Sequence, residues 1–304
     1  MRRGRAVFLN GRYLSQPTTG VQRHASELVH ALDALGGGTG FDFTLLAPGD
    51  SRDDPRLEHI PARKVGRLRG QAWEQLELPR HARDGILLSF ANTAPIAHRR
   101  QGITIHDASV FAVPGAYSFA FRTWYRILLP QLARRAGLLM TDSEFSRGEL
   151  ARWMGLDATR IRVVLCGCEH VLHEPADTSV IAAAGLEGRG YLLAIGGYRP
   201  HKNVALVERA VARLGAVAPI LVVVGRRNAR VFRGATFVND TVTLDHVTDS
   251  QLRALYEHAL CLVYPSRYEG FGLPPLEAMA CGCPAIVARA GSLPEVCGDA
   301  ALYV

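Results

Sequence analysis

The chain has 304 residues, of which 48% are hydrophobic and 21% are charged. This balance is typical of a folded globular protein and excludes a disordered one. No run of about 18 apolar residues occurs, so no membrane-spanning helix is expected. The apolar run at residues 6–9 is too short for a signal peptide, so a cytoplasmic location is expected. The net charge of +7 comes mostly from residues 1–176, which hold 23 basic and 17 acidic side chains. This excess of basic side chains favours an anionic partner such as a phosphate or a lipid surface. Because the basic residues are scattered along the sequence, nucleic acid is not a favoured partner.

Short apolar runs alternate with helical patterns along the first half of the chain. The predicted strands are residues 6–9, 41–46, 86–90, 103–105, 138–141 and 163–165, and the predicted helices are residues 21–35, 73–78, 119–135 and 146–154. The glycine-rich residues 36–40 follow a helix and not a strand, so they are interpreted as a turn. A dinucleotide-binding dehydrogenase is therefore disfavoured.

The second half repeats this alternation. The predicted strands are residues 191–195, 220–224, 242–244, 262–264, 285–288 and 301–304, and the predicted helices are residues 204–214, 250–258 and 275–280. Alternating strands and helices predict parallel sheets covered on both faces. We expect an α/β protein with two Rossmann-like domains, residues 1–175 and 176–304, facing a central cleft and joined by a linker at residues 174–190. Ligands of such sheets bind beyond the carboxyl ends of the strands.

Two residue types are distributed unusually. Lys64 and Lys202 are the only lysines among 35 basic residues, which hints that they are chemically required. The six cysteines include two pairs with one intervening residue, a spacing tighter than that of structural zinc sites. Reduced, mostly buried thiols are the expected state, and no metal site and no cofactor are predicted.

Residues 264–277 hold the densest group of candidate functional side chains. A loop containing Gly270 and Gly272 follows a predicted strand, and a helix begins near Pro275. The glycines let the backbone approach a ligand closely, and the free N–H groups of a helix start bind anions. Glu269 and Glu277 can accept hydrogen bonds from sugar hydroxyls. Alternatively, Glu277 only complements the helix dipole, but this leaves Glu269 and both glycines unexplained.

This segment resembles the E-x7-E signature of retaining glycosyltransferases with two Rossmann-like domains, the GT-B fold, and among them the large family 4. The resemblance covers nearly the whole chain and includes bacterial polysaccharide mannosyltransferases. The further motifs that carry it are residues 19–28, 105–107, 141–147, 196–203, 244–252, 277–287 and 291–301.

The resemblance implies a donor site for a sugar nucleotide. Lys202 would neutralise the diphosphate, Glu269 would contact the transferred sugar, and Glu277 would bind the ribose hydroxyls. The remaining donor-binding positions implied by the family motifs are Gly20, Arg199, Val247, Gly270, Phe271, Gly272 and Leu273.

The diphosphate-binding motif departs from the family pattern at two places. Many relatives carry an arginine where this chain has Gly197 or His201. Arg199, Arg226 and Arg227 remain the alternatives for the second cation.

Two features of the first half have more than one interpretation. His106 follows a predicted strand, as the active-site histidine of the family does, and a neutral imidazole there could hydrogen-bond a sugar hydroxyl. The predicted helix at residues 119–135 mixes aromatic residues with arginines. It is either a core helix with a solvated arginine face or an interfacial helix that touches anionic lipid.

The resemblance also implies a reaction class. The catalytic group would be His106, Lys202 and Glu269, with positioning and charge supplied by the protein and no nucleophilic side chain. The expected partners are a nucleotide-sugar donor, with GDP-mannose as first choice, and a glycan or lipid-linked acceptor. A further expectation is peripheral contact with the inner face of the membrane. Relatives usually continue past the last motif, so the C-terminal end is interpreted as truncated. The alternative functions are a non-catalytic sugar-nucleotide-binding protein and a sugar-nucleotide epimerase.

Overall fold

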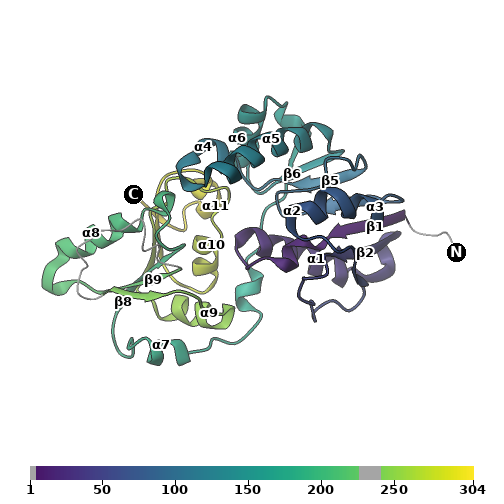
Figure 1. The fold of residues 1–304 in the computed structure, drawn as a ribbon. Coiled ribbons are helices and arrows are strands. Elements are labelled where there is room, and N and C mark those ends of the chain that lie inside the picture. The colour runs from purple at the N-terminus through teal and green to yellow at the C-terminus, as the bar shows by residue number, and fades with distance from the viewer. Residues whose placement is uncertain (1–4, 226–240) are drawn as a thin grey trace. The chain divides into compact units, whose positions relative to one another are not determined.

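A computed structural model describes residues 5–225 and 241–304 of the chain (Figure 1). The contacts divide the chain into two compact units. Unit 1 comprises residues 1–111 and 118–165, and unit 2 comprises residues 112–117 and 166–304.

Unit 1 is built on a parallel sheet with the strand order β3-β2-β1-β4-β5-β6-β7. The strands are β1 Arg5–Asn10, β2 Phe41–Ala47, β3 Ala62–Lys64, β4 Ile86–Ser89, β5 Gln101–Thr104, β6 Leu138–Thr141 and β7 Ile161–Val163. The chain extends the sheet on one side of β1 through β2 and β3, and then returns to place β4 on the other side. The strand order therefore reverses between β1 and β4, where ligands of open α/β sheets bind.

Helical segments connect the parallel strands of unit 1, as crossover connections require. The α-helices are α1 Gly20–Ala34, α2 Gly70–Ala72, α3 Leu78–His81, α4 Ser109–Ala112, α5 Phe119–Arg135 and α6 Glu144–Met154. A π-helical turn, η3 Trp73–Glu77, joins α2 to α3. The 3-10 turns between residues 5 and 165 are η1 Gly11–Ser15, η2 Gly36–Thr39, η4 Pro114–Ala116 and η5 Ala158–Arg160.

Unit 2 has a second parallel sheet with the order β10-β9-β8-β11-β12-β13. Its strands are β8 Tyr191–Ile195, β9 Ile220–Val224, β10 Thr241–Leu244, β11 Cys261–Tyr264, β12 Ala285–Val287 and β13 Leu302–Tyr303. Every residue of β9 is buried, which explains its continuous apolar sequence. Here the strand order reverses between β8 and β11.

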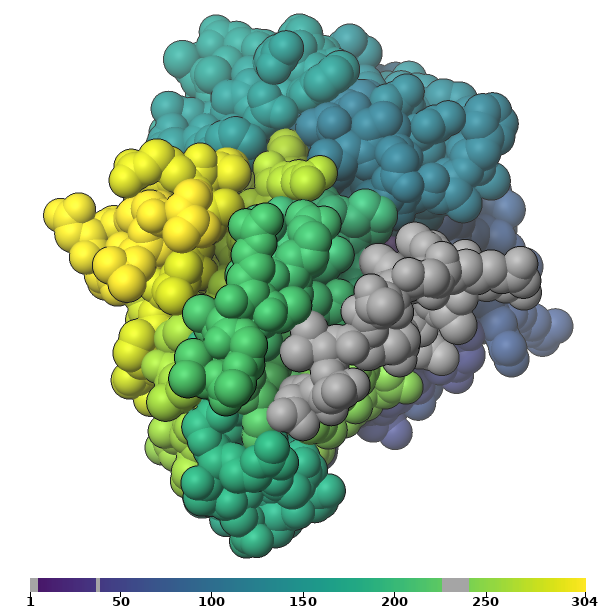
Figure 2. Space-filling model, turned by 90° about the vertical axis from the view of Figure 1, so that its left-hand side faces the viewer, coloured from purple at the N-terminus to yellow at the C-terminus, as the bar shows by residue number. Residues whose placement is uncertain are grey.

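The helices of unit 2 pack their apolar faces against this sheet. They are α7 Ser179–Ala183, α8 Val204–Leu214, α9 Asp249–His258, α10 Leu273–Ala280 and α11 Leu293–Cys297, with the 3-10 turns η6 Glu169–Leu172, η7 Pro200–Lys202 and η8 Gly215–Val217. Figure 2 shows helix α8, in green, and the C-terminal residues, in yellow, at the surface of this unit. None of the helices in the described part of the chain is long and apolar enough to cross a membrane.

The structure confirms the predicted α/β class and most of the predicted elements. It differs at β7, which lies two residues before the predicted strand at 163–165 because the exposed Leu165 lies outside the sheet. Residues 174–190 are not only a linker, since α7 buries Val180 and Ile181 in the core of unit 2. Strand β3 was not predicted, because all three of its residues are exposed and carry no apolar alternation.

Candidate functional site

Lys202 and Glu269 form an ion pair at the reversal point of the unit 2 sheet. Lys202 ends turn η7 after β8, and Glu269 lies in the loop after β11. The distance from Lys202 Nζ to Glu269 Oε1 is 2.6 Å, and the two side chains are 13% and 11% exposed. Lys202 Nζ also donates to the Tyr264 hydroxyl at 2.5 Å. The two residues that the sequence assigns to the diphosphate and the sugar are therefore brought together.

The electrostatics of this pair favour its charged form. Burial alone would raise the pKa of Glu269, but Lys202 and hydrogen bonds from Ser266 and Tyr264 hold it below its usual value. Burial and the Glu269 charge raise the pKa of Tyr264 well above its usual value, so its hydroxyl stays protonated. Burial and the Lys202 charge lower the pKa of His201 to about 4. Lys202 is thus a point charge beside a neutral imidazole.

Hydrogen bonds between the two loops fix the position of Lys202. The backbone N–H of Arg267 donates to the His201 carbonyl at 2.8 Å, and Ser266 Oγ donates to the same carbonyl at 3.2 Å. Ser292 Oγ lies 2.7 Å from the Phe271 carbonyl and 3.1 Å from the Glu269 carbonyl. The loop that carries Glu269 is therefore held on both sides.

The glycine loop leads directly into α10. Gly272 has a φ of 101°, a left-handed conformation that a residue with a side chain adopts only under strain. It is the N-cap of α10, and no side chain caps this helix start. Within the described residues, the first N–H groups of α10 thus have no side-chain cap and are suited to an anion, as the sequence predicts.

Glu277 is held by two donors that the sequence analysis did not identify. His170 Nε2 lies 2.9 Å from Glu277 Oε1, and the Tyr256 hydroxyl donates to Glu277 Oε2 at 2.8 Å. Glu277 is 7% exposed. Each carboxylate oxygen can accept a further hydrogen bond, so Glu277 keeps the acceptor capacity that ribose hydroxyls require. That role stays a prediction.

The other predicted residues of unit 2 are less enclosed. Arg199 is exposed next to η7, and its charge acts on His201 and Tyr264. Val247 is half-buried against the unit 2 core. Arg226 and Arg227 lie outside the described residues, so the choice of the second diphosphate cation stays open.

In unit 1, His106 is enclosed by hydrogen-bond acceptors. Nδ1 lies 2.6 Å from Asp142 Oδ2, and Nε2 lies 2.9 Å from the Phe90 carbonyl. A carbonyl oxygen only accepts, so Nε2 carries a proton, and Nδ1 donates to the Asp142 carboxylate when it is protonated as well. Burial would lower the pKa of His106, but the Asp142 carboxylate overcomes this and raises it. This direction favours the imidazolium over the neutral imidazole that the sequence analysis expects, and His106 is 5% exposed. A contact between His106 and a sugar hydroxyl stays a prediction.

A second histidine lies against this group. The His24 ring of α1 meets the His106 ring edge-on, with 4.8 Å between centroids. Burial and the charge of His106 lower the pKa of His24 to about 4. Gly20 is the exposed first residue of the same helix, whose N-cap, Thr19, makes no side-chain capping bond.

Comparison with known proteins identifies the family. Residues 18–170 match the family described as Glycosyltransferase Family 4, and residues 180–302 match Glycosyl transferases group 1. The chain is 31% identical to O-antigen chain mannosyltransferase B of Escherichia coli, over 95% of this chain and 84% of that protein. It is also 31% identical to O-antigen chain mannosyltransferase RfbU of Salmonella typhimurium, over 79% of this chain and 68% of that protein. The chain belongs to glycosyltransferase family 4.

The solved structures agree on the fold of this family 4 glycosyltransferase. The structure of Anabaena Alr3699/HepE in complex with UDP-glucose superimposes with a TM-score of 0.71 at 14% identity, covering 99% of this chain and 85% of that one. The two parallel sheets are those of the GT-B fold, which confirms the predicted fold class.

The sequence analysis did not identify the hydrogen-bond partners of the predicted site residues in this glycosyltransferase. Tyr264, His170, Tyr256 and Asp142 each bond a predicted site residue. His170 and Glu277 are 107 positions apart, and His106 and Asp142 are 36 apart. Asp142 lies within the motif at residues 141–147, and Tyr264 begins the candidate segment at residues 264–277, so these two had a signal in the sequence.

Proposed function

We propose that this glycosyltransferase moves a mannosyl residue from GDP-mannose to a hydroxyl of a glycan or lipid-linked glycan. The observation that carries the proposal is the buried Lys202–Glu269 pair at the reversal point of the unit 2 sheet, beside an α10 start without a side-chain cap. The mannosyl group is supported by the names of the two O-antigen mannosyltransferases to which the chain is similar.

The proposed roles follow from charge and position. The ammonium of Lys202 and the N–H groups at residues 270–273 stabilise the diphosphate as it departs. Glu269 and Glu277 accept hydrogen bonds from hydroxyls of the sugar and the ribose. Because these groups are a fixed cation and backbone donors, we propose a reaction that needs no metal ion.

The chemical step exchanges one bond at the anomeric carbon. The bond from this carbon to the diphosphate oxygen breaks, and a bond to the acceptor oxygen forms. The acceptor proton passes to the departing diphosphate on the same face of the sugar, so the anomeric configuration is retained. Lys202 is held for this step by Tyr264 and Glu269.

We also propose peripheral contact with an anionic membrane through the first half of α5. Phe119, Phe121, Trp124 and Ile127 are exposed there, whereas Leu128, Leu129, Leu132 and Ala133 of the second half are buried. Apolar side chains beside arginines suit the interface of an anionic bilayer. Sedimentation with vesicles containing phosphatidylglycerol tests this: Trp124→Ser should reduce binding, and unchanged binding would contradict it.

A thermal-shift screen across nucleotide sugars tests the donor assignment. A ligand at 100 times its Kd adds about 2.7 kcal/mol to the free energy of unfolding. GDP-mannose should raise Tm more than UDP-glucose or UDP-galactose, and GDP release should follow on addition of a glycan acceptor. Binding without turnover would favour the non-catalytic alternative, and a changed sugar on an intact nucleotide would favour an epimerase.

A further inference from the structure

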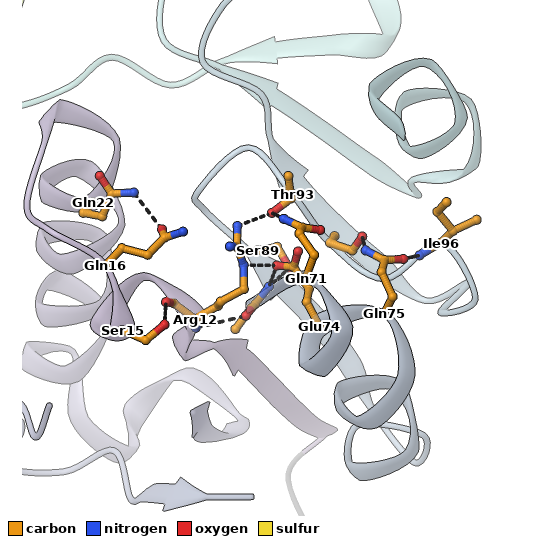
Figure 3. Close-up of polar contacts among 12 residues, drawn as sticks. Arg12, Ser15, Gln16, Gln22, Gln71, Glu74, Gln75, Ser89, Thr93 and Ile96 are labelled. Carbon is orange, nitrogen blue, oxygen red and sulfur yellow. Dashed lines mark hydrogen bonds and ion pairs between the residues drawn. The ribbon is translucent and has the colours of Figure 1, made fainter. Parts of the chain in front are cut away.

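A buried polar cluster lies at the reversal point of the unit 1 sheet. Its members are Asn10, Arg12, Gln71, Glu74, Ser89 and Thr93, which we call the Arg12–Glu74 cluster. Figure 3 labels all of them except Asn10. Asn10 ends β1 and Ser89 ends β4, so the cluster lies where the carboxyl ends of these neighbouring strands meet. This is the edge at which ligands of open parallel sheets bind.

The centre of the cluster is a buried ion pair. Arg12 Nε donates to Glu74 Oε1 at 3.0 Å, and the two side chains are 7% and 1% exposed. Asn10 Nδ2 donates to the same oxygen at 2.7 Å, while Arg12 Nη2 donates to Thr93 Oγ1 at 2.5 Å. Removing two charges from water can cost as much free energy as such a pair returns in stability. The buried pair is therefore weak evidence for a role in stability alone.

Two oxygens of the cluster lack a donor. Glu74 Oε2 and Gln71 Oε1 are buried, and no group of the described residues donates to either. They lie three positions apart on the segment of α2 and η3, so they belong to one helical face. Leaving a buried acceptor unpaired is costly, and π-helical turns such as η3 occur often at functional sites. The cluster reaches the surface through Gln71, which is half-buried.

The chemistry of the unpaired atoms defines what fits them. Both are acceptors, so a ligand that fits them supplies hydrogen-bond donors. One belongs to the Glu74 carboxylate, and although Arg12 pairs with its other oxygen, an anionic group placed against Glu74 Oε2 is repelled. Thr93 Oγ1 already accepts from Arg12 and lies within 3.5 Å of Gln71 Nε2, so its own proton is available to a ligand oxygen. A neutral saccharide with neighbouring hydroxyls provides this combination of donors and acceptors.

We infer that the Arg12–Glu74 cluster is a hydroxyl-binding subsite for the saccharide acceptor, selective for neutral over phosphorylated sugars. Glu74 Oε2 and Gln71 Oε1 accept from two hydroxyls of the acceptor. This inference rests on the proposed glycosyl transfer. It adds the place in unit 1 where the acceptor binds and the charge that this acceptor carries.

Binding and turnover on the whole protein test the inference with two sugars. Methyl α-D-mannopyranoside should show saturation transfer from the protein by NMR, and mannose 6-phosphate should not. Glu74→Gln and Gln71→Leu should each raise the KM for the methyl mannoside about 10-fold or more, the loss expected for a hydrogen bond to a charged or buried group. The KM for the donor and the slow hydrolysis of donor by water should not change.

Gln75→Leu is the matched control on the same segment. Gln75 donates to the Ala94 carbonyl and accepts from the Ile96 N–H, and neither belongs to the cluster, so this variant should lower stability and leave the acceptor KM unchanged. If Glu74→Gln does not fold, Gln71→Leu still decides the matter. Equal binding of both sugars, or acceptor KM values that match the control, would show that the cluster holds only water and overturn the inference. Failure of the wild type to turn over any donor would instead contradict the proposed function.

Discussion

Lys202 Nζ lies 2.6 Å from Glu269 Oε1, so the cation assigned to the donor diphosphate is already paired before any donor binds. Diphosphate and Glu269 must then compete for the same ammonium group. Removing either partner should have opposite effects on nucleotide binding.

The first prediction uses this competition. Lys202→Ala should weaken GDP binding and lower kcat about 100- to 1,000-fold, since a preorganised charge contact contributes about 2.7–4 kcal/mol in the transition state. Glu269→Gln should bind GDP as well as the wild type or better, because Lys202 loses its competing partner, yet transfer should fall. Calorimetry and initial rates measure both. Wild-type GDP affinity and turnover in Lys202→Ala would remove Lys202 from the mechanism.

The second prediction concerns Glu277. Glu277→Gln should raise the donor KM more than it lowers kcat, because a ribose contact is made equally in the ground and transition states. Glu257→Gln is a matched control, since Glu257 pairs with Arg253 on α9 and is not one of the predicted site residues. If Glu277→Gln only unfolds more easily and the folded fraction keeps a normal donor KM, the ribose contact is contradicted. The carboxylate would then have only the structural role of bonding His170 and Tyr256.

The third prediction is a pH dependence of stability from His106. Its pKa is raised in the folded state, so the pairing with Asp142 contributes fully below the unfolded value of about 6.5 and is lost as pH rises through the folded pKa. His24 acts in the opposite direction, because its pKa of about 4 makes protonation below 6.5 favour unfolding. Urea unfolding at several pH values gives the free energy of unfolding of the wild type and of Asp142→Asn. The difference between the two isolates the pairing of His106 with Asp142. The difference between the two free energies of unfolding should shrink with rising pH, and a difference that stays constant would contradict the raised pKa of His106.

The sequence predicted the elements that carry regular apolar patterns and the loops that carry glycine and proline. The loop at residues 269–273 could be placed because Gly270, Gly272 and Pro275 mark its conformation locally. Strand β3 and helix α7 could not, since the first has no buried residue and the second lies between linker-like residues.

The partners of the site residues were beyond sequence reasoning for a physical reason. Arg12 and Glu74 are 62 positions apart, and neither lies in a motif that was recognised. The protonation of His106 depends on Asp142 and the Phe90 carbonyl, which meet only in the folded sheet. Such charge states follow from tertiary packing and not from local pattern.

The fourth prediction concerns metal ions. The sequence has no Asp-x-Asp pair, since Asp53 and Asp54 are adjacent, and Lys202 with the α10 start can neutralise the leaving group. Transfer should therefore continue in excess EDTA at its original rate. Complete loss of activity on chelation, with recovery on addition of manganese, would show that a metal performs this task.

Product analysis by proton NMR tests the central claim most directly. The whole protein is incubated with GDP-mannose and methyl α-D-mannopyranoside, and the anomeric signals of the product are compared with GDP release. We predict one α-linked disaccharide for each GDP formed, and none with Lys202→Ala. A β-linked product would contradict retention, and GDP-mannose that remains intact beside every glycan acceptor tried would contradict the assignment of donor and function.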